Sequence, residues 1–106
     1  MNEAGANRLY EAERKGVPQL IGELANRSGG RCALGVLCYA APRLDRVRET
    51  FALGAPVDAC PLCGATHHTY WQGRPITDEE SLIVHFNNDH KLTLAEIARK
   101  LGPDGV

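Results

Sequence analysis

The sequence predicts a mainly α-helical fold, and a small α+β fold is the alternative because one segment has β character. Three observations support this prediction. Apolar residues in the first half of the chain recur at helical spacing, and two helix-start signals stand in the second half. Only residues 67–72 are rich in strand-forming residues. At 106 residues and 43% hydrophobic composition, the chain suits a single small domain.

Two helices are expected before residue 30. Residues 2–15 have helical composition, and Gly16 is suited to end that helix. Pro18 suits the first turn of a second helix, which the glycine pair at 29–30 would end. The apolar face of this second helix would carry Leu20, Ile21, Leu24 and Ala25.

A buried helix and a short helix are expected next. Residues 31–41 are small and nearly all apolar, and Pro42 would stop a helix there. Cys32 and Cys38 lie in this segment, where they are expected to pack as small core side chains. Their spacing puts them on different faces of a helix, so they would not share a metal ion. Residues 43–57 would hold a short helix followed by a linker.

Two capping-box sequences in the second half predict the starts of two further helices. Residues 77–80 and 93–96 each place a threonine three residues before a glutamate. Acidic residues in the first turn also suit the positive end of the helix dipole. The two helices should end at residues 87–88 and 100–101, and a Gly-Pro pair follows the second of them.

Four side chains have the spacing of a tetrahedral zinc site. Two residues separate Cys60 from Cys63, and four residues separate His85 from His90. Cysteine sulfur and histidine nitrogen are the ligands that zinc prefers in structural sites. Four protein ligands leave no open position, so the pattern predicts one structural Zn²⁺ rather than a catalytic ion.

Other interpretations of the same motif remain open. His67 and His68 follow the cysteine pair closely, and either of them could replace one of the later histidines. The cysteines could also be two buried thiols or a redox pair. A redox Cys-x-x-Cys motif is expected between a strand and a helix, whereas a glycine and a β-like segment follow this one. The zinc interpretation is therefore favoured.

Residues beside the metal motif suit supporting roles. Tyr70 and Trp71 are interpreted either as an exposed recognition patch or as a hydrophobic cover over the zinc site, and the cover is favoured. Asn87, Asn88 and Asp89 are expected to end the helix or to orient a ligating imidazole through its free nitrogen.

Catalytic and nucleic-acid functions receive less support. The stretch from His85 to His90 is superficially similar to His-Asn-His nucleases, but the helix after it offers no further metal ligand. Asp78, Glu79 and Glu80 give the start of a helix the wrong charge for contact with phosphate. The net charge of −1 provides no general attraction to nucleic acid or to an anionic membrane. No catalytic residue is predicted, and nucleic-acid binding is kept as an alternative.

Several segments resemble small uncharacterised proteins of bacteriophages and prophages. The resemblance rests on Cys-Ala-Leu-Gly at 32–35, the Cys-x-x-Cys pair, the stretch from His85 to His90, and Ala-Glu-Ile-Ala at 95–98. The chain departs from the family pattern in the three residues, Asn-Asn-Asp, that precede the second histidine. The resemblance implies a phage or bacterial origin and supports both histidines as matched positions. It implies no function.

The expected organisation is one domain over residues 1–106, with a helical part at 1–57 and a zinc-binding part at 58–106. No signal peptide or membrane span is recognisable, so a cytoplasmic protein without membrane contact is expected. The expected role is non-enzymatic binding of a protein partner, a host or phage factor. A nucleic-acid-binding regulator is the second hypothesis and a metal-dependent hydrolase the third. The sequence does not indicate an oligomeric state.

Overall fold

The computed structural model describes residues 1–40, 44–71 and 73–103, and within them the chain forms five α-helices. They are α1 (Glu3–Arg14), α2 (Ala33–Ala40), α3 (Leu44–Thr50), α4 (Glu79–Asn88) and α5 (Leu94–Leu101). Among these described residues, β structure is limited to isolated bridges. The prediction of a mainly α-helical fold is therefore confirmed.

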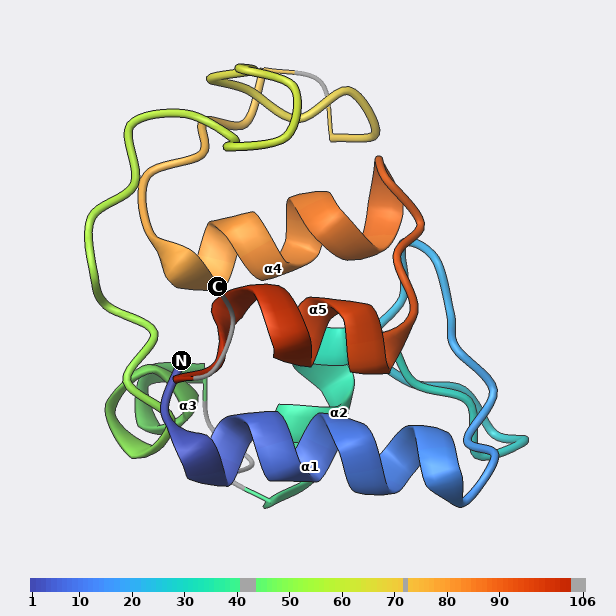
Figure 1. Ribbon diagram of the computed structural model, residues 1–106. Coiled ribbons are helices and arrows are strands. Elements are labelled where there is room, and N and C mark those ends of the chain that lie inside the picture. The colour runs from blue at the N-terminus through green and yellow to red at the C-terminus, as the bar shows by residue number, and fades with distance from the viewer. Residues whose placement is uncertain (41–43, 72, 104–106) are drawn as a thin grey trace.

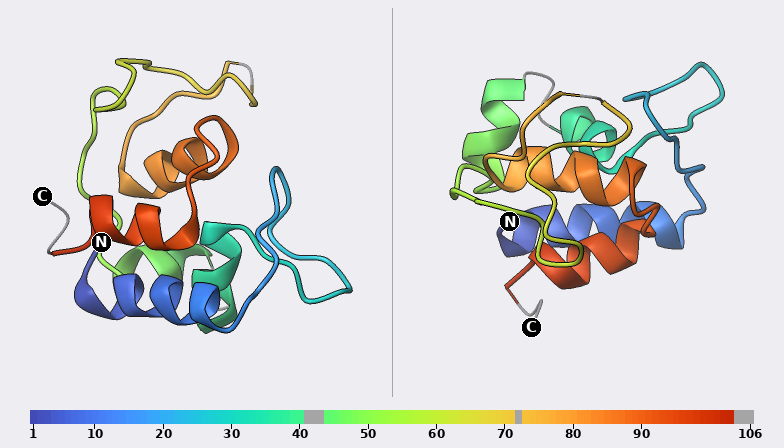
Figure 2. Two further views of the ribbon diagram at one scale, coloured as in Figure 1. Left: turned by 45° about the vertical axis from the view of Figure 1, so that its right-hand side comes forward. Right: turned by 90° about the horizontal axis from the view of Figure 1, so that it is seen from above.

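The helices lie in layers that are easily followed in the ribbon diagram. Helix α5 lies between α1 and α4, and α2 packs against both α1 and α4 (Figure 1). The long segment that joins α3 to α4 arches over α4, on the side away from α1 and α5 (Figures 1 and 2). This segment contains the cysteine pair, so the fold brings it above the helix that carries His85.

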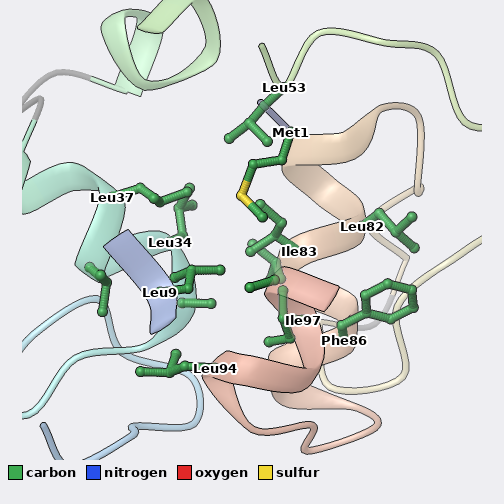
Figure 3. Packing of buried hydrophobic residues seen from close by; sticks show 14 of the residues in the cluster. Met1, Leu9, Leu34, Leu37, Leu53, Leu82, Ile83, Phe86, Leu94 and Ile97 are labelled. Atoms are coloured by element: carbon green, nitrogen blue, oxygen red, sulfur yellow. The ribbon is translucent and has the colours of Figure 1, made fainter. Parts of the chain in front are cut away.

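Apolar side chains from both halves of the chain fill one interior cluster (Figure 3). Leu9 of α1, Leu37 of α2, Ile83 of α4 and Ile97 of α5 are fully buried in it. Burial of one such side chain contributes roughly 1.5–3 kcal/mol relative to leaving it exposed. The cluster holds α4 in a fixed position, and α4 in turn supports the candidate site.

Helix α1 begins and ends as the sequence predicts. The side-chain oxygen of Asn2 accepts a hydrogen bond from the amide of Gly5 at 3.0 Å, which caps the first turn. The helix ends at Arg14, and Gly16 then has a left-handed backbone conformation with a φ of +76°. Glycine adopts this conformation without steric cost, so the chain can turn back here.

The second helix predicted from Pro18 does not form. Residues 17–32 instead make turns and two isolated bridges to Arg31. Leu24, which was expected on the apolar helix face, is 45% exposed. The prediction relied on local apolar spacing, and tertiary contacts override such a local preference.

Two asparagines of α4 make the tertiary contacts that hold this loop. The Nδ2 of Asn87 donates to the carbonyl of Leu20 at 2.8 Å, and its Oδ1 accepts from the amide of Ala33 at 3.0 Å. The Oδ1 of Asn88 accepts from the amide of Gly22 at 2.9 Å. These bonds satisfy backbone groups that a helix would have satisfied internally, so the loop is stable without helical structure.

Helices α2 and α3 follow the prediction in place and type. Helix α2 starts at Ala33 within the apolar segment, and its first turn lies against the preceding loop: a Cβ added to Gly35 would lie 1.8 Å from the carbonyl oxygen of Leu24. Only glycine permits this approach. Helix α3 is the expected short helix and buries Val47. The stop predicted at Pro42 lies outside the described residues.

Helices α4 and α5 both start with a capping box, but the first box lies one residue later than predicted. Asp78 rather than Thr77 is the N-cap. Its carboxylate accepts from the amide of Ser81 at 2.8 Å, and the Ser81 hydroxyl accepts from the amide of Asp78 at 3.0 Å. A carboxylate is the stronger acceptor, and the serine hydroxyl completes the reciprocal pair. At α5 the predicted residues, Thr93 and Glu96, form the box.

The predicted helix ends are confirmed, whereas the predicted β segment is not a strand. Helix α4 ends at Asn88 and α5 at Leu101. Of the segment at 67–72, one residue, His67, forms an isolated bridge, with Pro75, and residue 72 lies outside the described part. Two of its amides bond to a side-chain carboxylate instead of to a partner strand, so the segment turns.

Candidate metal centre

A tight turn carries Cys60 and Cys63. The amide of Gly64 donates to the carbonyl of Cys60 at 2.8 Å, and Gly64 has a φ of +74°, which favours glycine. The amide of Leu62 approaches the Sγ of Cys60 at 3.4 Å. Burial raises the pKa of the Cys60 thiol, and a zinc ion bound here would supply the positive charge that favours its thiolate form.

His85 and His90 come from the end of α4 and from the turn that follows it. His85 lies in the last turn of the helix and is 2% exposed. The amide of His90 donates to the carbonyl of His85 at 3.3 Å, and the amide of Leu92 donates to the carbonyl of Phe86 at 3.1 Å. Lys91 has a φ of +54°, which reverses the chain. The two imidazole ring centroids are consequently only 4.8 Å apart.

The two cysteines and the two histidines meet at one point. The Sγ of Cys60 lies 3.5 Å from the Nε2 of His90, and the Sγ of Cys63 lies 3.5 Å from the Nε2 of His85. All four ligand atoms lie within 4.8 Å of one another. Zinc bonds of about 2.3 Å to sulfur and about 2.0–2.1 Å to nitrogen separate these ligands by about 3.6 Å in a tetrahedron. The arrangement is therefore compatible with one zinc ion at the four predicted residues.

Asp89 fixes the orientation of the His85 ring. Its Oδ2 lies 2.6 Å from the Nδ1 of His85, and because a carboxylate only accepts, the Nδ1–H donates. The same carboxylate accepts from the amides of Thr69 and Tyr70 at 2.8 and 2.7 Å. Burial alone would raise the pKa of Asp89, but these amides and the His85 ring outweigh it and lower the pKa. Asp89 therefore stays ionised and leaves the Nε2 of His85 for a metal.

Only one of the three polar residues expected to support the metal site does so directly. Asp89 is four residues after His85, so the two lie on the same face of the helix. Asn87 and Asn88 bind the loop at residues 17–32 instead. The sequence contains no signal for the amides of residues 69 and 70, because backbone groups of any sequence could fill that role.

The two competing histidines lie outside the group formed with the cysteines. His67 is exposed, and its Nδ1 lies 2.9 Å from the hydroxyl of Thr66. His68 is buried beside His85, with ring centroids 5.6 Å apart, and forms a second cluster with His85 and Asp89. Burial, followed by the neighbouring His85, lowers the pKa of His68, so its ring is neutral near pH 7. It packs against the site as a neutral side chain.

Of the two aromatic residues beside the cysteine pair, Trp71 packs toward the site, whereas the ring of Tyr70 lies against Gly22 of the loop at 17–32. The ring of Trp71 meets the ring of His68 edge-on, with ring centroids 5.8 Å apart. His68 in turn packs against His85, so Trp71 contacts the candidate metal centre only through His68. Trp71 is nevertheless 38% exposed and Tyr70 is 53% exposed. The expected hydrophobic cover is therefore at most partial, and both rings also face solvent.

The two remaining cysteines pack as the sequence predicts. Cys32 is buried, and its Sγ accepts a hydrogen bond from the amide of Gly35 at 3.3 Å. Cys38 is partly buried against the same core. Burial raises the pKa of both thiols. Neither belongs to a group of metal-ligating side chains in the described part of the chain.

Comparison with known proteins adds no assignment to this geometry. No protein-family model, curated protein or solved structure matches the chain. None of its described helices is long and apolar enough to cross a membrane. The class of protein is therefore defined by the fold and the site alone: a small, mainly α-helical protein with a Cys₂His₂ cluster compatible with zinc.

Proposed function

We propose that this chain is a zinc-binding protein in which Cys60, Cys63, His85 and His90 hold one structural Zn²⁺. The observation that carries the proposal is the convergence of two sulfur and two imidazole nitrogen atoms within 4.8 Å. A Cys₂His₂ set with Zn²⁺ is formally neutral, so its partial burial carries little electrostatic penalty. Because four protein ligands fill the coordination sphere, no position remains for water or substrate, which supports a structural rather than a catalytic role.

The metal would connect a loop to the helical core. The loop between α3 and α4 has no helix or strand of its own among its described residues. Its cysteines face histidines that belong to α4 and to the turn after it. A zinc ion at this point would act as a cross-link, and its binding free energy would contribute directly to folding of the loop.

The loop held in this way would bind a protein partner, without catalysis. Among the described residues, the exposed large apolar side chains are those of Leu24, Leu62, Tyr70 and Trp71. Three of them belong to the loop, and Leu24 lies in the neighbouring loop at 17–32, which Tyr70 contacts at Gly22. Tyrosine and tryptophan are the residues that contribute most often to protein interfaces. The resemblance to phage and prophage proteins suggests a bacterial or phage protein as the partner.

Nucleic-acid binding is the alternative, and one observation favours it. The guanidinium of Arg74 lies 5.9 Å from the centroid of the Trp71 ring. Aromatic rings beside arginine are typical of surfaces that stack bases of single strands. The first turn of α4, however, contains the acidic residues Glu79 and Glu80, and negative charge does not favour contact with phosphate. The protein-binding role is therefore preferred.

Native mass spectrometry under reducing conditions tests the zinc site. The wild-type chain should carry one zinc, whereas Cys60→Ala and His90→Ala should each lose it. His67→Ala is the matched control, because this exposed histidine lies outside the cluster and its loss should leave the zinc content unchanged. A wild-type chain without zinc, or a His67→Ala variant that loses it, would overturn the assignment.

Capture from a bacterial lysate tests the interaction. A protein retained by the wild type should be lost with the double variant Tyr70→Ala and Trp71→Ala, at unchanged zinc content. Lys100→Ala, an exposed change on α5, should retain it. Retention that is equal for all three proteins would contradict the proposed surface. Nucleic acid that is retained and then released as salt is raised would favour the alternative function.

A further inference from the structure

A cavity beside α1 shares no lining residue with the metal centre. Its volume of about 340 Å³ lies at the lower end of the roughly 300–1,000 Å³ that is typical of small-molecule sites. Ala12, Val17 and Val36 form an aliphatic floor. Ala12 and Val36 belong to the buried core and Val17 packs against it, so the floor is fixed by the fold.

The rim of this cavity carries more positive than negative charge. Arg8 and Lys15 approach it from α1, and Arg31 approaches it from the segment before α2. The only carboxylate among the described lining residues is that of Glu11, which lies 3.0 Å from the Nζ of Lys15. Both side chains of this ion pair are exposed, so the pair contributes little to stability. The Lys15 ammonium has three N–H donors, so it can bind a second anion as well.

Backbone hydrogen bonds hold the floor and the rim together. After the left-handed turn at Gly16, the amide of Val17 donates to the carbonyl of Ala12 at 3.0 Å, which returns the chain to the end of α1. The amide of Arg31 then donates to the carbonyl of Pro18 at 2.8 Å. These bonds place a cation from a distant part of the sequence beside the end of α1, so the cavity is formed before any ligand binds.

We propose that this cavity binds a small amphiphilic anion, namely a carboxylate on a short aliphatic chain. The aliphatic part would lie on the floor of Ala12, Val17 and Val36, and the carboxylate would accept hydrogen bonds from Arg8 and Lys15. Bonds between a carboxylate and guanidinium or ammonium groups are charge-assisted, and arginine can form two of them in parallel. A neutral ligand would form no ion pair with Arg8, and an inorganic anion would leave the floor uncovered.

Titration of the zinc-loaded protein with hexanoate, followed by NMR, tests the proposal. Hexanoate should shift the methyl signals of Val17 and Val36 and should reach saturation. Two matched probes separate the contributions: hexanamide lacks the charge and acetate lacks the chain. Hexanamide should bind at least about tenfold more weakly because it loses a charge-assisted contact. Acetate should also bind at least about tenfold more weakly, because it lacks four methylene groups that would be buried on the floor. Absence of a saturable shift, or equal binding of hexanamide, would overturn the proposal.

Two arginine variants locate the site. Arg8→Gln removes a rim cation and should weaken hexanoate binding about tenfold. Arg14→Gln removes an exposed cation of the same helix that does not line the cavity, so its affinity should match the wild type. Equal loss in both variants would indicate unspecific attraction, and no loss in Arg8→Gln would exclude this cavity. The zinc content of both variants is measured in parallel, because the cavity is independent of the proposed metal.

Discussion

At the scale of single residues, Asp89 connects α4 to the loop that carries the cysteines. One carboxylate accepts hydrogen bonds from the His85 ring and from the amides of Thr69 and Tyr70. It therefore joins a candidate metal ligand to the loop that carries the cysteines. A residue of this kind selects one tautomer of the imidazole and raises its basicity as a ligand.

Replacement of Asp89 by asparagine should weaken zinc binding. The amide keeps the shape of the side chain but loses the charge that orients His85, and such changes typically reduce metal affinity about 10–100-fold. Competition with a chromophoric zinc chelator measures the change. Asp58→Asn, at an exposed carboxylate near the cysteine pair, is the control and should leave the affinity unaltered. Equal affinities in the two variants would contradict the orienting role.

Gly35 has a purely steric role that can be tested separately. A Cβ at this position would meet the carbonyl oxygen of Leu24 at 1.8 Å, so Gly35→Ala should lower the free energy of unfolding by about 1–3 kcal/mol. Gly54→Ala is the matched control, because its nearest atom would lie at 3.5 Å, an ordinary contact. Urea denaturation measures both variants. A Gly35→Ala variant as stable as the wild type would show that the loop does not lie against α2.

At the scale of elements, the loop at residues 17–32 and helix α4 depend on each other. The loop contains several turns and has its backbone groups satisfied largely from α4. The carboxamide of Asn87 is central, since it bonds to Leu20, Ala33 and the side chain of Gln19. The loop therefore gains its structure from a residue more than 50 positions later in the chain.

Asn87→Ala should release this loop. Each buried backbone group left without a partner costs about 1–3 kcal/mol, so the free energy of unfolding should fall by at least that amount. Hydrogen exchange should show faster exchange at the amide of Ala33 than in the wild type. Asn7→Ala, at an exposed position of α1, should change neither property. Unaltered protection at Ala33 in the Asn87→Ala variant would contradict the role of Asn87.

The elements that could be predicted from the sequence are those specified by nearby residues. Helix α5 has its capping box and its glycine stop within ten residues, and both were predicted correctly. The loop at 17–32 was predicted as a helix because its apolar spacing is local, whereas the hydrogen bonds that determine it come from α4. At the start of α4 two adjacent residues, Thr77 and Asp78, could each cap, and the reciprocal bond to Ser81 decides between them.

The candidate site could likewise be predicted only where residues close in the sequence specify it. Short spacings predicted which four side chains would converge, because a two-residue turn and a helix end each fix one ligand pair. Spacing could not decide between His67 or His68 and the later histidines, because the loop path determines which rings face the cysteines. The path of the loop depends on hydrogen bonds from the amides of Thr69 and Tyr70 to Asp89. Backbone amides are present in every sequence, so the residue types do not predict these bonds.

At the scale of the whole molecule, the helices and the loop above α4 have different sources of stability. The interior cluster draws on every helix, including Leu9 of α1 and Ile97 of α5. The loop contributes fewer buried apolar side chains, among them Cys60 and Ile76. The helical core should therefore persist without metal, whereas the loop should depend on it.

Removal of zinc by a chelator should affect the loop before the core. Trp71 is the only tryptophan of the chain and lies in this loop, so its emission should shift to longer wavelength as it becomes more exposed. Far-ultraviolet circular dichroism should keep most of its helical signal, because the interior cluster remains. Loss of the helical signal in step with the tryptophan shift would contradict this separation.

The proposed zinc site places two cysteine sulfurs and two histidine nitrogens around one ion. X-ray absorption spectroscopy at the zinc edge of the purified, reduced protein tests it most directly. The spectrum should show two sulfur neighbours at about 2.3 Å and two nitrogen neighbours at about 2.0–2.1 Å. A shell of oxygen and nitrogen neighbours without sulfur, or with a different number of sulfur atoms, would contradict the proposed site.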